Sequence, residues 1–116
     1  SEQVCFLNGE FLPLAEARIP VLDRGFIFGD GVYDVVPVYG RKLFRLDEHL
    51  ARLNRSLDKI RIPRPATQDE WIARCRHLVA SRPEADQVVY IQVTRGVAPR
   101  DHVMPAQPVP TVFMMS

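Results

Sequence analysis

Apolar residues follow a helical period in the middle of the chain. Between positions 46 and 60 they recur every three or four residues, which is the spacing of one face of an α-helix. The members of this face are Leu46, Leu50, Leu53, Leu57 and Ile60. We predict that the helix opens with Asp47 as its N-cap and ends before Pro63, because proline disfavours helical geometry in the residue that precedes it.

A second helical stripe follows the first. Thr67 precedes Glu70 by three residues, the spacing of a capping box in which each side chain bonds to the backbone N–H of the other. The apolar face after this box consists of Trp71, Ile72, Cys75, Leu78 and Val79. The sequence Ser81-Arg82-Pro83 then predicts the end of the helix.

The regions on either side of the helices have the pattern of β-strands. The predicted strands lie within residues 4–14, 32–40, 41–46, 87–95 and 109–116. Asn8-Gly9 tolerates the positive φ values of a tight turn, which predicts a first hairpin. Pro37 has no backbone N–H, so its strand should lie at a sheet edge or bulge there. Residues 15–31 show no clean period and are expected to form an ordered loop.

The order of the elements, strands, two helices and strands, predicts the α+β class. The expected architecture is a β-rich sheet with both helices packed on one side. A chain of 116 residues with 47% hydrophobic and 25% charged residues has the size and composition of one soluble domain. Because the chain ends at Ser116 inside an apparent strand, we expect that something follows in the natural protein.

Charge and cysteine content argue against several classes of function. The formal net charge is +1, whereas proteins that bind nucleic acid or acidic membranes carry a strongly basic face. No apolar run approaches the ~18 residues of a membrane helix and no signal peptide is evident, so a cytoplasmic setting is the default. Cys5 and Cys75 have no CxxC or Cys/His pattern, which predicts free core thiols and no metal site.

The stretch TRGVAPRDH, residues 94–102, places Arg95, Arg100 and His102 after a strand. Arg100 and His102 are two apart and project to the same side if the segment is extended. A guanidinium matches a carboxylate or phosphate with two parallel bonds, and a histidine adds a donor. Two interpretations stay open at this point: an anion site, or a surface pair between Arg100 and Asp101.

Two further groups can contact an anion. His49 and Arg52 are three apart, hence neighbours on one face of the first helix, where Arg52 can bind a phosphate; a solvated helix face is the alternative. In GDGVYD, residues 29–34, glycines let the backbone approach a ligand and Tyr33 offers a hydroxyl. A plain loop leading into a strand, with Tyr33 packed in the sheet, would have the same pattern.

Three segments in register resemble a known family. DRGFIFGDGVYDVV, LDEHLARL and QVTRGVAPRDH resemble the N-terminal domain of the class IV pyridoxal-phosphate aminotransferases, from about residue 6 to 105. Branched-chain aminotransferases and aminodeoxychorismate lyases look similar around the first segment, whereas the Arg-x-His of PRDH favours the D-amino-acid aminotransferase branch. The resemblance implies that residues 1–116 are the small domain of a homodimeric enzyme that moves an amine from a D-amino acid to a 2-oxo acid.

The resemblance also implies roles for single residues. Arg52 matches the arginine that grips the phosphate of pyridoxal 5'-phosphate (PLP), and His49 matches a histidine near the same end of the cofactor. Arg100 and His102 match the pair that holds the substrate α-carboxylate, on a loop that reaches the neighbouring subunit's active site. Tyr33 matches a tyrosine of that carboxylate site.

One part of the family's chemistry is expected to lie elsewhere. The Schiff-base lysine belongs to the larger C-terminal domain, which is absent from this chain. The lysines here are Lys42, in a predicted strand, and Lys59, on the solvated side of the first helix. We therefore expect no catalytic residue in this chain and no activity from it alone. The alternatives are a branched-chain aminotransferase or aminodeoxychorismate lyase of the same fold, and a non-catalytic anion-binding module.

Overall fold

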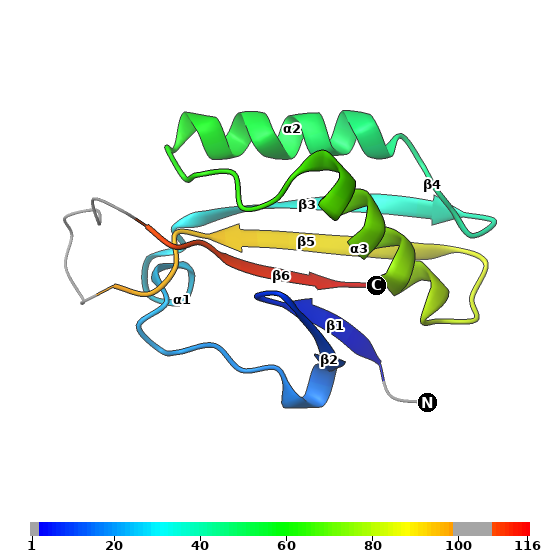
Figure 1. The fold of residues 1–116 in the computed structure, drawn as a ribbon, viewed down its shortest axis with the longest axis horizontal. Coiled ribbons are helices and arrows are strands. Elements are labelled where there is room, and N and C mark those ends of the chain that lie inside the picture. Colours follow the sequence, from blue (N-terminus) through cyan, green and yellow to red (C-terminus); the bar gives the residue numbers. More distant parts are fainter. Residues whose placement is uncertain (1–2, 99–107) are drawn as a thin grey trace.

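The computed structural model describes residues 3–98 and 108–116. Its strands are β1 (Val4–Leu7), β2 (Glu10–Pro13), β3 (Gly31–Tyr39), β4 (Lys42–Leu43), β5 (Gln87–Thr94) and β6 (Thr111–Met115). Its helices are the 3-10 turn η1 (Leu14–Glu16), α1 (Arg24–Phe28), α2 (Leu46–Lys59) and α3 (Gln68–Ala80). Within these residues the strands form one six-stranded antiparallel sheet in the order β2-β1-β6-β5-β3-β4 (Figure 1).

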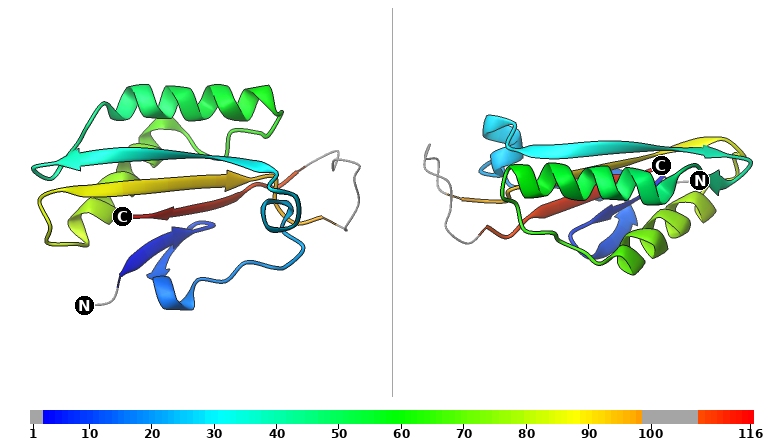
Figure 2. Two further views of the ribbon diagram at one scale, coloured as in Figure 1. Left: turned by 180° about the vertical axis from the view of Figure 1, so that it is seen from behind. Right: turned by 90° about the horizontal axis from the view of Figure 1, so that it is seen from above.

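The two long helices, α2 and α3, cover the same face of the sheet (Figure 2). Successive side chains of a strand point to opposite faces, so Val36 and Val38 of β3 both face the helices and are fully buried. Leu50, Leu53 and Leu57 of α2 join them in one apolar core, together with side chains from α3, β5 and β6. The α+β prediction with both helices on one side is confirmed.

The opposite face of the sheet is largely open to solvent. Tyr33 and Tyr39 of β3 and Val88 of β5 are each more than half exposed there, with exposed fractions of 67%, 58% and 51%. The left view of Figure 2 looks at this face, on which no long helix of the described residues lies. We call it the open face below.

Turn and cap chemistry agrees with the sequence in two places. Asn8 and Gly9 join β1 to β2 with φ values of 47° and 95°, which confirms the predicted hairpin. Thr67 Oγ1 accepts from the Glu70 N–H at 3.2 Å, and Glu70 Oε1 accepts from the Thr67 N–H at 2.8 Å. The capping box at the start of α3 is therefore confirmed.

The predicted N-cap of α2 is wrong. Arg45 takes that position in a left-handed conformation, with φ 53° and ψ 43°, and makes no side-chain cap bond. Asp47 lies instead in the first turn, where its charge favours the helix dipole and its Oδ1 accepts from Gln68 Nε2 at 3.2 Å. The left-handed turn at Arg45 starts the helix earlier than the side-chain pattern indicated.

The segment 15–31 is not only a loop. It contains η1 and the single-turn helix α1, which Asp23 caps by accepting from the Gly25 N–H at 2.8 Å. Gly29 ends α1 in the left-handed conformation, with φ 65°. A five-residue helix is too short to show a period of 3.6, so its apolar pattern carried no signal.

Among the residues that the structure describes, no strand pairs with the outer edge of β3 over most of its length. β4 pairs only with Val38 and Tyr39, so Pro37 lies beyond the end of β4. This agrees with the expectation that the strand around Pro37 is at an edge, because the missing N–H of Pro37 does not break a ladder there. The Pro37 carbonyl accepts from the Phe44 N–H at 2.8 Å, so the stretch of edge without a strand partner is residues 31–36, between the helix layer and the open face.

Two other expectations concern the core and the membrane. Cys5 and Cys75 are both buried and free, as predicted. Burial raises the pKa of both thiols, that of Cys75 to about 12, which keeps them protonated.

Among the described residues, the helices are all too short or too polar to cross a membrane.

Candidate functional site

Asp34 of β3 is the centre of a charged cluster beside the uncovered edge. Its side chain points toward the helix layer, in phase with Val36 and Val38, and is only 3% exposed. A buried carboxylate is costly unless it is paired and hydrogen-bonded. Its own neighbour satisfies part of this requirement, since the Val35 N–H donates to Asp34 Oδ1 at 2.9 Å.

Two side chains of α2 complete the shell of Asp34. Arg52 donates from Nε to Oδ2 at 2.9 Å and from Nη2 to Oδ1 at 2.7 Å, the two parallel bonds typical of an arginine and a carboxylate. His49 Nδ1 lies 2.9 Å from Oδ1. Because residues three apart on a helix are neighbours, both side chains reach the same carboxylate from one face of α2. The predicted proximity of His49 and Arg52 is confirmed, with 3.2 Å between His49 Nδ1 and Arg52 Nη2.

The cluster holds Asp34 in its charged form. Burial by itself would raise the pKa of the Asp34 carboxyl. Hydrogen bonds from Arg52 and His49, and their charges, act in the opposite direction and hold this pKa below its ordinary value of 3.8. The guanidinium of Arg52 is thereby fixed against β3 by a partner that stays ionised at neutral pH.

Acidification is expected to release this cluster. A carboxyl whose pKa is lowered by folding contributes stability that is complete above its unfolded pKa, near 3.8, and that is lost as the pH falls through the lower pKa of the folded state. We expect the urea concentration at the unfolding midpoint to decrease as the pH is lowered below about 4. The decrease should be less steep in Asp34→Asn, because the amide cannot take up a proton. An equal slope in both proteins would contradict the assignment to Asp34.

One side of Arg52 remains open to a ligand. Its side chain is 58% exposed, and its Nη1 makes no hydrogen bond within the described part of the chain. It lines a depression of about 290 Å³ on the surface of α2, together with Arg45, Glu48, His49 and Arg55. Its three guanidiniums are accompanied by two carboxylates, because Glu48 pairs with Arg45 at 3.6 Å and Asp34 with Arg52 at 2.7 Å, so the cations outnumber the acids by one. This charge balance suits an anion such as a phosphate.

Tyr33 lies on the other side of the same strand edge. As the residue before Asp34, it points to the open face, where its side chain is 67% exposed. Tyr33 and the Asp34 cluster therefore flank the uncovered edge of β3 from opposite faces of the sheet.

The remaining predicted residues fall into two groups. Arg95 is not available to a ligand, because it is buried, pairs with Asp30 at 2.7 Å and donates to the carbonyls of Ile60 and Arg61. Arg100 and His102, the predicted carboxylate pair, lie outside the described residues.

Sequence reasoning gave no role to Asp34. A signal existed, because Asp34 occupies the inward phase of a strand whose next inward residues are Val36 and Val38. An acidic residue at a core-facing position needs a cationic partner. That the partners come from α2, 15 and 18 residues further along the chain, is decided only by the packing of α2 on β3.

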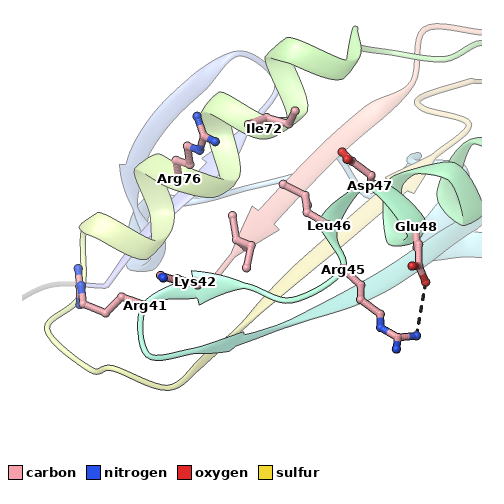
Figure 3. Close-up of a pocket in the computed structure, with 9 residues that line it drawn as sticks. Arg41, Lys42, Arg45, Leu46, Asp47, Glu48, Ile72 and Arg76 are labelled. Carbon is pink, nitrogen blue, oxygen red and sulfur yellow. Dashed lines mark ion pairs between the residues drawn. The ribbon is translucent and has the colours of Figure 1, made fainter.

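A second, larger depression lies at the start of α2 and contains none of the predicted site residues. Its volume is about 620 Å³, and Figure 3 shows it between α3, β4 and the first turn of α2. Lys42 lines this depression and not the one beside Arg52. The guanidinium of Arg41 at its rim is already bonded to the carbonyls of Val79, Arg82 and Glu84. We therefore place the candidate site at the β3 edge.

Comparison with known sequences identifies relatives of the chain. Residues 31–116 match the family described as amino-transferase class IV, a range that begins at the first residue of β3. The D-alanine aminotransferase of Staphylococcus epidermidis is 40% identical over 109 residues, which cover 94% of this chain and 39% of that protein. The chain thus spans less than half the length of the curated relatives it matches.

Solved structures share the fold. The branched-chain amino acid aminotransferase from Escherichia coli matches 99% of this chain and 40% of its own, with a TM-score of 0.90 and 22% identity. The 4-amino-4-deoxychorismate lyase from Pseudomonas aeruginosa matches 95% of this chain and 38% of its own, with a TM-score of 0.75 and 25% identity.

The family match covers most of the chain and includes the whole charged cluster of Asp34, His49 and Arg52. Enzymes of this family depend on PLP. Sequence and fold agree: the chain belongs to the class IV aminotransferase family.

Proposed function

We propose that this chain is the N-terminal small domain of a D-amino-acid aminotransferase. The choice among the family's branches is supported by 40% identity over 109 residues to the D-alanine aminotransferase of Staphylococcus epidermidis. It is supported further by the Arg-x-His of residues 100–102, which resembles the D-amino-acid branch.

The observation that carries the proposal is the geometry of Arg52. Asp34 fixes the guanidinium through Nε and Nη2, while the same side chain is 58% exposed and lines a depression that it shares with Arg45 and Arg55. The residues present thus fit the phosphate group of PLP: Arg52 would hold it, and His49 would lie beside it. Asp34 would act through both of them, by fixing their orientation.

The substrate carboxylate would be held by other residues of this chain. Tyr33 offers its exposed hydroxyl from the open face. Arg100 and His102 would hold the same carboxylate with charged donors. In a homodimer that pair would serve the neighbouring subunit, as the family resemblance implies, so each active site would need both copies.

The bound cofactor supplies an electron sink for amine transfer. The residues of this chain orient the substrate against it. A carboxylate fixed by Tyr33, Arg100 and His102 leaves the α-hydrogen on one defined side of the substrate, and this placement selects the D-enantiomer. The same carboxylate is present in the 2-oxo acid, so one set of contacts serves both half-reactions. The lysine required by the chemistry would come from a second domain, and the chain by itself is expected to be inactive.

Substrate tests distinguish the proposal from its alternatives. The intact natural protein is expected to transfer the amine of D-alanine to 2-oxoglutarate. Turnover of L-leucine instead would favour a branched-chain aminotransferase, and release of pyruvate from aminodeoxychorismate would favour the lyase. A natural protein with the mass of the 116-residue chain, which binds PLP or phosphate without turnover, would favour the anion-binding module.

Replacement of Arg52 is expected to weaken cofactor binding selectively. Arg52→Ala should lower the affinity of the intact protein for PLP about 30-fold, because charge-assisted hydrogen bonds to the phosphate are lost. Arg52→Lys should give an intermediate loss, since a lysine keeps the charge but not the planar fork. Equilibrium dialysis against PLP measures both effects without any need for activity.

Arg64 provides a matched control for Arg52. It makes the same two-bond contact with Asp58, at 3.2 and 2.7 Å, and is 54% exposed. Arg64→Ala removes an equivalent surface arginine and should leave PLP affinity unchanged. Equal losses in Arg52→Ala and Arg64→Ala would show that Arg52 is a structural arginine and not a phosphate ligand.

A further inference from the structure

Tyr33 receives no side-chain support from its own strand on the amino-terminal side. Its ring stands on the open face, 67% exposed, and its neighbour in the chain on the amino-terminal side along this face is Gly31, which has no side chain. An exposed tyrosine has several rotamers available. A hydroxyl that holds a carboxylate must stay in one of them, because positioning is what the contact contributes. The inference below rests on the proposed role of Tyr33.

Tyr90 supplies a stacking partner from the neighbouring strand. The rings of Tyr33 and Tyr90 are 5.8 Å apart between centroids, with 23° between their planes. In the register of β3 and β5, Tyr90 lies opposite Val35 and Gln92 lies opposite Tyr33. Tyr90 is therefore the diagonal neighbour of Tyr33, at a distance that long aromatic side chains bridge.

Tyr90 is itself held in place by two other side chains. Its hydroxyl donates to Gln92 Oε1 at 3.0 Å. Its ring also meets Phe113 of β6, with 6.4 Å between centroids. Burial, and to a lesser degree the neighbouring Tyr33, raises the pKa of the Tyr90 hydroxyl, so it stays a protonated donor to Gln92.

We propose that Tyr90 is a positioning residue: its fixed ring holds the Tyr33 ring by stacking and so presents the Tyr33 hydroxyl to the substrate carboxylate. Tyr90 acts through Tyr33, and its own hydroxyl is occupied by Gln92. Its loss should therefore affect the step that uses the carboxylate and not the binding of the cofactor phosphate, which belongs to the other side of the β3 edge.

The first test replaces the Tyr90 ring in the intact protein. Tyr90→Leu should raise KM about fivefold for D-alanine and for 2-oxoglutarate alike, because both substrates carry the carboxylate. The change in kcat should be smaller, and the affinity for PLP should stay unchanged. A fivefold change corresponds to roughly 1 kcal/mol, the size of one aromatic pair. Tyr90→Phe keeps the ring and should restore KM to within about twofold.

Tyr39 is a matched control on the same strand. It is 58% exposed, points to the same face as Tyr33 and contacts Phe44 edge to face at 5.6 Å. Tyr39→Leu removes an exposed aromatic ring of β3 without touching the Tyr33–Tyr90 pair, and should leave KM unchanged. A rise in KM equal to that of Tyr90→Leu would attribute the effect to general loss of aromatic surface and would overturn the proposal.

A double-mutant cycle gives the decisive readout. In a Tyr33→Phe background the hydroxyl that Tyr90 positions is gone, so Tyr90→Leu should add no further rise in KM. Additive effects of the two changes would overturn the proposal. If Tyr33→Phe alone leaves KM unchanged, Tyr33 does not hold the substrate carboxylate. The proposed positioning role of Tyr90 then fails as well.

A measurement on the wild-type protein covers the case in which Tyr90→Leu does not fold. Nuclear Overhauser contacts between the rings of Tyr33 and Tyr90 should be observed, together with restricted motion of the Tyr33 ring. A freely averaging Tyr33 ring without contacts to Tyr90 would overturn the stacking support. This outcome is independent of any activity, so it is distinguishable from a failure of the proposed function.

Discussion

Gly96→Ala is expected to lower the free energy of unfolding by about 4 kcal/mol, one of the two largest effects predicted for this chain. Gly96 adopts φ 94°, which side chains rarely tolerate. A Cβ atom at this position would also overlap the carbonyl oxygen of Val109, which belongs to the backbone and cannot turn aside. Urea unfolding followed by the fluorescence of Trp71, the single tryptophan and fully buried, measures the change.

Gly9→Ala separates the two causes. Gly9 has φ 95°, almost the value of Gly96, but no atom lies within 4 Å of the position that its Cβ would take. Its replacement should cost only the strain of the positive φ, roughly 1 to 2 kcal/mol. If both alanine variants show the same decrease in the free energy of unfolding, the close approach of Gly96 to Val109 does not contribute to the cost of the Gly96 replacement.

Asp23→Ala is expected to have an effect of similar size, about 4 kcal/mol. The Asp23 side chain has no exposed surface and joins three segments. It accepts from Thr94 Oγ1 at 2.7 Å, from Thr111 Oγ1 at 2.6 Å and from the Gly25 N–H at 2.8 Å. Removal of the carboxylate leaves buried donors at the ends of β5, β6 and α1 without an acceptor. The same urea experiment measures the loss.

Asp23→Asn is the matched variant for this prediction. The amide keeps the shape and one acceptor oxygen, which can serve Gly25 and Thr94, while the Thr111 hydroxyl can turn to accept from the amide nitrogen. We expect a loss of about 1 kcal/mol, well below that of Asp23→Ala. A loss as large as that of the alanine variant would show that the charge of Asp23, and not its bonding pattern, stabilises this junction.

Both predictions concern the place where the proposed carboxylate pair joins the sheet. Arg100 and His102 lie between β5 and β6 in the sequence, and Thr94 and Thr111 are the facing end residues of those strands. Asp23 ties the two strand ends together, and Gly96 allows the chain after β5 to pass against Val109. Weakening either contact should therefore also raise KM for substrates in the intact protein.

The local pattern of the sequence was enough to predict much of the fold. Leucines at helical spacing predicted α2, and the Thr67 and Glu70 pair predicted the start of α3. Asn8 and Gly9 predicted the first hairpin. These features depend on neighbours within a few residues, which the sequence contains directly. α1 was missed, because a single turn is shorter than the window in which a period can be recognised.

The candidate site was only partly accessible in the same way. His49 and Arg52 could be placed on one helix face from their spacing alone. Their common partner, Asp34, and the burial of Arg95 depend on contacts between segments far apart in the chain. Sequence reasoning placed Asp34 in a strand but assigned it no role, and it left Arg95 without an assigned partner; packing supplied both.

The sequence by itself determined the element order, the α+β class and the residues whose chemistry suits anions, because periodicity, capping and side-chain type are local properties. Only the tertiary structure decided that Asp34 holds His49 and Arg52 on one side of the β3 edge and that Tyr33 stacks on Tyr90 on the other. The physical reason is that strand register and helix packing bring together side chains whose separation along the chain carries no local signal.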